Sequence, residues 1–359
     1  MNRDLRVAVI GTGHLGRIHA KLLRQVAGAE LLAVCDPNAA ACQRVADDHD
    51  ARACTDVTQC IDDIDAAVIA APTDCHAAIA TELIEAGKHV LVEKPLASSA
   101  SDANRLAMLA THRGVVMQVG HVERFNPAFT SLGDYGNDVK YVEATRASRF
   151  PGRCLDVGVV MDLMIHDIDL VLAFTDAPVR SIHASGLSVV SSHEDIAEVR
   201  LEFECGLVAN LKASRISPTP ARDMVVYSPA GFAQIDFGKP ALATVAVSDS
   251  ISQRDFRLEA STDDPLSFAD DLFSEHLQCD VQELEPRNAI LDELHDFVVS
   301  IQSGSDPVVH GAAGARAVTV AECILEEIAR RDWYGSSASE ERGARAMVRQ
   351  RITRRRAAA

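Results

Sequence analysis

Three polar side chains recur at helical spacing near the middle of the chain and could transfer a proton. Asp162, His166 and Asp169 stand at i, i+4 and i+7, which places them on one face of an α-helix. Removing hydride from a carbinol carbon requires an acceptor for the hydroxyl proton, and histidine titrates in the right range. The same spacing is also typical of surface or capping pairs. Asp and His at i, i+4 can ligate zinc, but no convincing set of further ligands accompanies them, so we expect no metal.

A lysine stands at the end of a short apolar strand. In HVLVEKPLASS, residues 89–99, four residues read as a buried strand, and Glu93, Lys94 and Pro95 follow them. Parallel sheets bind ligands at the carboxyl ends of their strands. Lys94 would therefore lie where it can hydrogen-bond a reacting oxygen or relay its proton, and Pro95 would stiffen the exit.

A glycine-rich turn joins the first predicted strand to a helix. It consists of Gly11, Thr12, Gly13, His14, Leu15 and Gly16. In this GxGxxG pattern the glycines permit a tight turn and let the backbone approach a pyrophosphate, which the helix N-terminus binds. The second strand ends in Asp36, whose carboxylate can accept hydrogen bonds from ribose hydroxyls and would repel a 2′-phosphate. No arginine follows Asp36, so the pattern predicts NAD rather than NADP as the cofactor.

Alternating strands and helices position these motifs in the first third of the chain. The apolar runs LRVAVI, LLAVCD, AAVIAAP, HVLVEK and VVMQVG predict strands, and helical patterns such as HLGRIHAKLLRQV lie between them. This alternation predicts a parallel sheet covered on both faces. We expect an N-terminal Rossmann dinucleotide-binding domain over residues 1–122, with ARAC, around residue 53, as a further short strand.

The pattern changes in the rest of the chain. VKYVEATRASRF predicts a strand, VVMDLMIHDIDLVLAF predicts a helix, and alternating runs with hairpin signals extend from roughly 179 to 248. Helical stretches near 287–302 and 312–330 close the folded part. The predicted fold class is therefore α/β, in which a C-terminal α+β domain, residues 123–334, has a large open, mainly antiparallel sheet and serves substrate binding and oligomerisation. Residues 335–359 form a basic C-terminal tail.

Composition limits the classes of partner. The net charge of −17 argues against a nucleic-acid-binding body, and no window approaches the roughly 18 unbroken apolar residues of a membrane span. The nine cysteines lack a CxxC or a metal-type cluster, and the N-terminus lacks signal-peptide organisation, which together favour a cytoplasmic protein. An open sheet exposes one face unless something covers it, which predicts a homodimer or homotetramer.

The tail is a local exception to the acidic composition. Seven arginines and no acid follow Glu341. We expect a solvated tail, with docking to an acidic partner as the alternative.

Three separated motifs occur in the order that is typical of one oxidoreductase family. GTGHLG with His19, then APTDCHAAIATELIEAGKHVLVEKPL, then DLMIHDID together resemble the glucose–fructose oxidoreductase / inositol dehydrogenase (Gfo/Idh/MocA) family over residues 5–330. That family consists mostly of NAD(P)-dependent sugar and cyclitol oxidoreductases. The chain departs from it in residues 157–161, VGVVM, where the glycines that often precede the family's Asp–His pair are missing.

The resemblance implies roles for individual residues. Lys94 and His166 would form the catalytic pair, and Asp162 would assist them. Further cofactor contacts are implied for Pro72, Thr73, His76 and Glu93.

Two segments resemble one branch of the family more than the others. They are GHVERFNPAF, residues 120–129, and DVGVVMDLMIHDIDLVL. That branch oxidises the 3-hydroxyl of UDP-N-acetylglucosamine to a 3-keto sugar for transamination in lipid A assembly, which implies a downstream aminotransferase as partner. The residues that this implies for substrate contacts are Arg124, Asn126, Arg149 and Asp169. Arg124 and Arg149 could equally form ion pairs at a domain interface.

Three other functions stay open. An inositol or free-sugar dehydrogenase of the same family would not need diphosphate-binding arginines. An NAD-retaining glycoside hydrolase would produce no net NADH. A non-catalytic NAD-sensing regulator would have no need of Lys94 together with Asp162 and His166.

Overall fold

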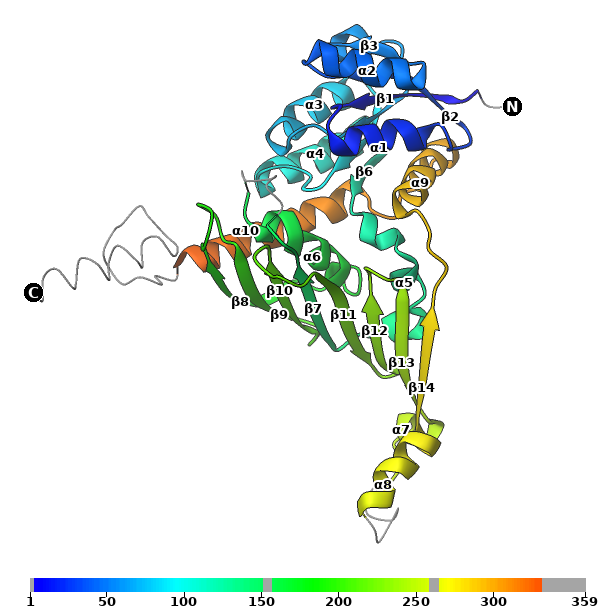
Figure 1. Cartoon of the computed structure of the whole chain (residues 1–359), viewed down its shortest axis with the longest axis vertical. Coiled ribbons are helices and arrows are strands. Elements are labelled where there is room, and N and C mark those ends of the chain that lie inside the picture. The colour runs from blue at the N-terminus through cyan, green and yellow to red at the C-terminus, as the bar shows by residue number, and fades with distance from the viewer. Residues whose placement is uncertain (1–2, 151–156, 258–264, 331–359) are drawn as a thin grey trace, which may run out of the picture. The chain divides into compact units, whose positions relative to one another are not determined.

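The computed structural model describes residues 3–150, 157–257 and 265–330. Contacts between residues divide the chain into two compact units (Figure 1). The first unit contains Met1–Phe125 and Arg287–Glu322, and the second contains Asn126–Pro286 and Cys323–Ala359.

The first unit is built on a six-stranded parallel sheet. Its strands lie in the order β3-β2-β1-β4-β5-β6. They are β1 (Leu5–Ile10), β2 (Ala29–Cys35), β3 (Arg52–Cys54), β4 (Ala66–Ile69), β5 (His89–Glu93) and β6 (Met117–Gly120). All five pairs of neighbouring strands are parallel, as the sequence predicts for a Rossmann domain. The short strand expected around residue 53 is confirmed as β3.

Helices cover this sheet because the strands are apolar on both faces. The helices within the first 125 residues are α1 (His14–Leu23), α2 (Ala39–His49), α3 (Thr73–Glu85) and α4 (Ala100–Arg113), with short 3₁₀ turns η1 (Val57–Gln59) and η2 (Val122–Phe125). Helix α1 contacts α2, while α3 contacts α4 and lies on β4 and β5. Every residue of β4 is buried, as expected for a central strand of a parallel sheet.

A helix from late in the chain completes the core of the first unit. Helix α9 (Ala289–Ser303) contacts α1 (Figure 1). Its apolar side chains recur at helical spacing, and Leu294 and Phe297 are fully buried in one cluster with Val7 and Val9 of β1. The sequence predicts residues 287–302 within the C-terminal domain, whereas contacts group Arg287–Glu322 with the first unit.

The second unit is built on an eight-stranded sheet in the order β14-β13-β12-β11-β7-β10-β9-β8. The strands are β7 (Tyr141–Ala147), β8 (Val179–Leu187), β9 (Ile196–Phe203), β10 (Val208–Ser214), β11 (Ala221–Ser228), β12 (Gly231–Asp236), β13 (Ala241–Val247) and β14 (Leu277–Glu283). Strands β7 and β10 pair in parallel, and the other neighbours pair antiparallel. The large, mainly antiparallel sheet predicted from the sequence is therefore confirmed.

The second unit also contains short helices. They are α5 (Pro127–Thr130), the 3₁₀ turn η3 (Gly133–Gly136), the π-helical turn η4 (Val160–Met164), α6 (Ile165–Leu172), α7 (Asp249–Ser252), α8 (Pro265–Asp271) and the π-helical turn η6 (Leu272–His276). Helix α6 contacts β7 and β10. In β9, residues at alternate positions are buried, and Glu198 and Arg200 between them are exposed. This period of two is typical of a sheet with one covered face.

The last described helix is α10 (Gly311–Arg330), and its residues are divided between the two units at Glu322. The predicted basic tail, 335–359, lies outside the described residues. Across 3–150, 157–257 and 265–330, no helix combines the length and the apolar character that crossing a bilayer would require.

Candidate active site

The turn after β1 fits a dinucleotide because each glycine of the GxGxxG motif has its own steric reason. Gly11 has a φ of +97°, and a Cβ there would lie 2.6 Å from the carbonyl oxygen of Ala70. A Cβ on Gly16 would lie 1.8 Å from the carbonyl oxygen of Gly11. A Cβ on Gly13, by contrast, would meet no heavy atom within 4 Å. Gly11 and Gly16 therefore permit the packing of the turn, whereas Gly13 leaves room outside it for a pyrophosphate.

The N-terminus of α1 faces this opening. His14 and Leu15 are the first residues of the helix, and no side chain caps it at Gly13. Unpaired amides at a helix N-terminus bind anions well.

Asp36 stands at the end of β2 with both carboxylate oxygens oriented by the backbone. Its Oδ2 accepts hydrogen bonds from the amide and the hydroxyl of Thr12, each at 2.8 Å, and its Oδ1 accepts one from the amide of Asn38 at 2.9 Å. Burial acts to raise the pKa of Asp36, but these hydrogen bonds outweigh it and hold the pKa below its ordinary value. The carboxylate is therefore ionised at neutral pH and can accept hydrogen bonds from a ribose diol.

We expect Asp36→Ala to weaken NAD binding by about 10- to 100-fold, because a hydrogen bond to a charged group contributes about 1.5–3 kcal/mol. The preference for NAD over NADP should shrink at the same time, since no charge would repel a 2′-phosphate. Calorimetric titration with both dinucleotides measures the two effects. Thr12→Val is the control, because it removes one hydrogen bond to Asp36 but keeps the carboxylate. Unchanged selectivity in Asp36→Ala would contradict the ribose role.

Lys94 follows directly on β5, at the carboxyl end of the parallel sheet, and is half-buried. Its amide donates a hydrogen bond to Oε2 of Glu93, and its peptide bond to Pro95 is cis. The structure thus places Lys94 at the sheet edge that the sequence predicts, on the same edge as the glycine-rich turn after β1.

The predicted cofactor-side turn after β4 lies at this edge too. Pro72 is the N-cap of α3, and Thr73 is its first residue. His76 is buried, and its Nδ1 and Nε2 lie 2.9 Å from the carbonyl oxygens of Pro95 and Ala71, respectively. His76 therefore joins the turn after β4 to the turn that carries Lys94, and its cofactor contact stays a prediction.

Glu93 is buried rather than open at the sheet edge. Its Oε1 lies 2.7 Å from Nε2 of His19 on α1. A cofactor contact for Glu93 stays a prediction, and its partner His19 is discussed below.

In the second unit, Asp162 lies in a π-helical turn, whereas His166 and Asp169 lie in α6. The amide of Ile165 bonds to the carbonyl of Val160, five residues earlier. The single α-helix predicted here is therefore wrong in its first turn, and the i, i+4 relation between Asp162 and His166 does not have pure α-helical geometry. Asp162 and His166 are half-buried, and Asp169 is 1% exposed. Single π turns occur frequently at functional sites.

Glu194, which precedes β9, holds the π turn at its N-terminal end. Its carbonyl oxygen accepts a hydrogen bond from the amide of Val159, and its Oε1 accepts one from the amide of Val160. A Cβ on Gly158 would lie 1.9 Å from the carboxylate of Glu194. The glycine that this chain keeps in VGVVM therefore permits the contact that orients the segment before Asp162.

A buried ion pair holds the same segment from the sheet side. Arg215 and Asp195 are both fully buried, and Nε of Arg215 donates to Oδ1 of Asp195 at 2.8 Å. One terminal nitrogen of Arg215 also donates to the carbonyl oxygen of Val157 at 2.9 Å. A second ion pair, between Arg146 of β7 and Asp167 of α6, fixes the helix on the sheet.

The predicted substrate residues lie in different elements. Arg124 is half-buried in η2 of the first unit. Asn126 is buried, and its side chain caps α5 by accepting a hydrogen bond from the amide of Ala128. Arg149 is exposed, and its Nε donates to the carbonyl oxygen of Pro218. Substrate contacts for these residues and for Asp169 stay predictions.

The sequence assigns no site role to two further functional candidates. His19 and Glu293 are buried beside Glu93 in the first unit. The signal for Glu293 is its place on the apolar face of α9, next to Leu294, where an acid is out of pattern. The sequence marks His19 only by its position shortly after the glycine-rich turn, and that position does not indicate which residues its side chain contacts.

Comparisons with known proteins cover both units. Residues 5–121 match the model of an oxidoreductase family with an NAD-binding Rossmann fold, and residues 132–234 match the model of a GFO/IDH/MocA C-terminal domain. UDP-N-acetylglucosamine 3-dehydrogenase of Acidithiobacillus ferrooxidans is 33% identical over 318 residues, which are 88% of this chain and 95% of that relative. A solved structure of that enzyme superposes with a TM-score of 0.79 at 31% identity, over 91% of this chain and 98% of that one.

A relative of different substrate class is also similar. The scyllo-inositol 2-dehydrogenase (NAD(+)) of Bacillus subtilis is 31% identical over 237 residues, which are 61% of this chain and 69% of that relative.

Proposed function

This chain belongs to the Gfo/Idh/MocA family of NAD-binding oxidoreductases, and we propose that it oxidises the 3-hydroxyl of UDP-N-acetylglucosamine to the 3-keto sugar. That it is an NAD-dependent dehydrogenase acting on a sugar CH–OH group follows from its relatives. The finer assignment rests on one observation, the 33% identity to a UDP-N-acetylglucosamine 3-dehydrogenase over 95% of that relative.

In the proposed reaction, the residues of each unit have separate tasks. The glycine-rich turn and Asp36 hold NAD, which when bound accepts the hydride from the carbinol carbon. His166 takes the proton of the reacting hydroxyl, since histidine exchanges protons near neutral pH. Asp162 stabilises the imidazolium that forms. Lys94 hydrogen-bonds the same oxygen and stabilises the charge that develops on it as the C–H bond breaks.

The proposal is tested by NADH absorbance with purified protein, NAD, and a panel of UDP-sugars, free sugars and inositols. A ketone trap, or the partner aminotransferase with glutamate, would draw the reaction forward. A signal with UDP-N-acetylglucosamine, but with neither UDP nor N-acetylglucosamine alone, is the expected result. A signal with scyllo- or myo-inositol instead would assign the protein to the inositol dehydrogenases, which its likeness to the Bacillus enzyme supports.

If no alcohol of the panel produced NADH, the proposal would be overturned. Tightly retained NAD together with cleavage of a glycoside would then indicate the NAD-retaining hydrolase. NAD binding without any turnover would indicate a regulator.

Arg149 gives the proposal a second test, because its guanidinium is exposed and suits a diphosphate. We expect Arg149→Ala to raise the KM for the UDP-sugar by about tenfold or more and to leave kcat nearly unchanged. This is the expected pattern because a diphosphate contact stabilises the bound substrate and the transition state equally. Arg124→Ala should behave alike. Arg180→Ala is the matched control, since Arg180 is exposed in the same unit but pairs with Glu202. Steady-state kinetics that leave KM unchanged in both variants would contradict a diphosphate contact.

Assembly into homodimers or homotetramers, coupling to an aminotransferase and a cytoplasmic location accompany this proposal as predictions.

A further inference from the structure

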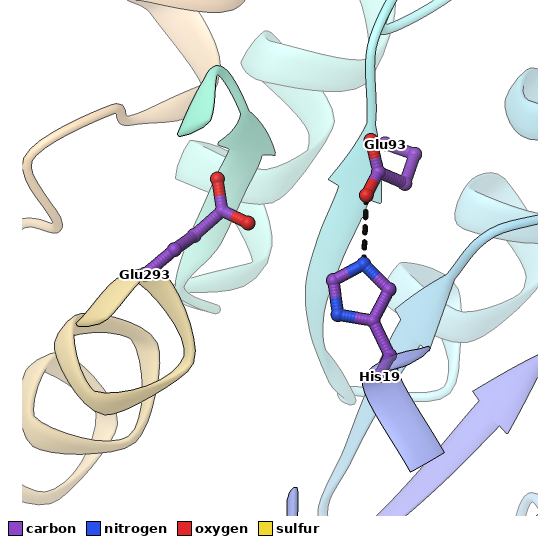
Figure 2. A group of neighbouring side chains, drawn as sticks. All are labelled: His19, Glu93 and Glu293. Atoms are coloured by element: carbon purple, nitrogen blue, oxygen red, sulfur yellow. Dashed lines mark hydrogen bonds and ion pairs between the residues drawn. The ribbon is translucent and has the colours of Figure 1, made fainter. Parts of the chain in front are cut away.

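Three ionisable side chains are buried together in the first unit, near Lys94 at the end of β5. They are His19 of α1, Glu93 of β5 and Glu293 of α9, and one ligand-type atom from each lies within 4.8 Å of the others. Figure 2 shows the imidazole ring of His19 hydrogen-bonded to the Glu93 carboxylate, with the carboxyl group of Glu293 across from them. The three side chains are 0%, 8% and 1% exposed. Burying ionisable groups so deeply is costly unless protons or partners neutralise them.

The hydrogen bonds of this cluster centre on the Glu93 carboxylate. Nε2 of His19 lies 2.7 Å from Oε1 of Glu93, and Oε2 of Glu93 accepts the amide hydrogen of Lys94 at 3.2 Å. Both oxygens of Glu93 are therefore engaged. Among the described residues, Nδ1 of His19 and Oε1 of Glu293 have no hydrogen-bond partner.

These two orphan atoms complement each other if Glu293 carries a proton. When Nε2–H of His19 donates to Glu93, the neutral ring keeps a lone pair on Nδ1 that needs a donor. A protonated carboxyl group supplies one O–H donor, whereas a carboxylate can only accept. Because one ring nitrogen of His19 and one carboxyl oxygen of Glu293 lie within 4.8 Å of each other, a side-chain rotation or a bridging water would complete the bond to Nδ1.

The electrostatic surroundings of Glu293 favour the same protonation state. Burial raises its pKa well above the ordinary value, and the nearby charges of Glu93 and Asp296 raise it further. Burial acts on Glu93 in the same direction, but the hydrogen bond from His19 and the nearby charge of Lys94 lower its pKa overall. Two further elements lie near Glu293. Gln118 of β6 donates a hydrogen bond to the Glu293 backbone carbonyl, and η2, which contacts α9, carries Glu123 and Arg124.

We propose that Glu293 is held protonated and donates through His19 to Glu93, forming a buried chain that positions the backbone of Lys94. Glu293 and His19 are thus positioning residues, because they act on the reaction only through Glu93 and Lys94. The packing of β6 supports this role, since a Cβ on Gly120 would lie 2.8 Å from Oε2 of Glu93 and the glycine leaves that oxygen room to hold the Lys94 amide. The inference rests on the proposed function in so far as Lys94 is catalytic.

A divalent metal is the chemical alternative, because one imidazole and two carboxylates can ligate zinc. The hydrogen bond between His19 and Glu93 already engages Nε2 and Oε1, two of the ligand-type atoms of the cluster. Among the described residues, no fourth His, Cys, Asp or Glu joins the cluster. The observed bond therefore favours the proton.

Two variants of the full chain test the chain of hydrogen bonds. Glu293→Gln keeps a neutral donor and should retain kcat within a few-fold of the native value. Glu293→Leu removes the donor and should lower kcat by about 10- to 100-fold with the NAD affinity nearly unchanged, as expected when a reacting group is slightly misplaced. The control is Glu85→Gln, which changes an exposed acid of the same unit. Equal kcat in Glu293→Leu and the native protein, with Lys94→Ala inactive, would overturn the inference but leave the proposed function standing.

A stability measurement tests the protonation state without any activity assay. A raised pKa in the folded state stabilises the protein fully below the ordinary pKa of 4.5, and this stabilisation is lost as pH rises toward the folded-state pKa. Over that range, the unfolding equilibrium constant of the native protein, divided by that of Glu293→Gln, should rise up to about tenfold per pH unit. A pH-independent ratio would overturn the inference. So would stoichiometric metal in the purified protein, measured by mass spectrometry, that Glu293→Gln releases.

Discussion

Replacing Lys94 with alanine should lower kcat by about 100- to 10,000-fold, the usual contribution of a positioned acid or base. His166→Ala should have an effect of the same order. Neither side chain belongs to the turn that fits the pyrophosphate, so NAD affinity should stay near its native value in both variants. Stopped assays of turnover, together with calorimetric titration of NAD, measure the two quantities separately.

The controls for this prediction are residues of the same type on exposed surfaces. Lys21 is exposed on α1, and His183 is exposed on β8. Lys21→Ala and His183→Ala should keep native rates. Near-native turnover in both Lys94→Ala and His166→Ala would contradict the catalytic pair, even if the dinucleotide bound as expected.

Asp195→Ala should cost about 3–5 kcal/mol of the free energy of unfolding of the second unit, because it leaves the guanidinium of Arg215 buried without its counter-ion. The Asp195 carboxylate also accepts hydrogen bonds from the amides of Val189, Val190 and Ser191, so the loop before β9 would lose these three bonds as well. Denaturant unfolding followed by circular dichroism measures the loss. Glu198→Ala, on the adjoining strand β9, breaks an exposed pair with Lys212 and should cost about 1 kcal/mol or less.

The same ion pair predicts how stability depends on acid. Burial acts to raise the pKa of Asp195, but the amides of Val190 and Ser191 and the guanidinium of Arg215 lower it to about 2. A lowered pKa stabilises the folded state above the ordinary pKa near 3.9, and this contribution is lost as pH falls toward about 2. Asp195→Ala should therefore lose less stability than the native protein between about pH 4 and pH 2. If Asp195→Ala and Glu198→Ala lost similar amounts of unfolding free energy at neutral pH, burial would not explain the importance of the pair between Asp195 and Arg215.

Local pattern was sufficient to predict the first sheet and its cofactor turn. The strand before Gly11, the motif itself and Asp36 lie within one βαβ unit, where each feature has a short-range cause. The sequence predicted that the second sheet is large and mainly antiparallel, but it did not predict the order of the strands. The parallel pairing of β7 with β10 joins residues that are far apart in sequence, so no local pattern indicates it. Strand β14 was not predicted. Apolar and polar residues do alternate in LQCDVQE, but all of them except Leu277 are exposed, so the alternation does not mark a buried face.

The sequence suggests which residue types could form the active site, but it does not show what surrounds each of them. Lys94 does lie at the end of β5, as the sequence implies. The π turn at Asp162 depends on Glu194 and Arg215, which bind the preceding backbone from the sheet and cannot be recognised in the helix sequence. Likewise, the sequence does not indicate that Glu293 of α9 is buried next to His19 and Glu93, because this contact forms only in the folded unit.

The position of α9 in the first unit has a consequence for biosynthesis. Translation proceeds at about 5–20 residues per second, so α9 leaves the ribosome on the order of ten seconds after β6. Until then, Val7 and Val9 lack the cover that Leu294 and Phe297 provide in the finished protein. The cofactor-binding unit is thus the first to be synthesised and among the last to be completed. A nascent chain would present its apolar sheet face to chaperones throughout the synthesis of the second unit.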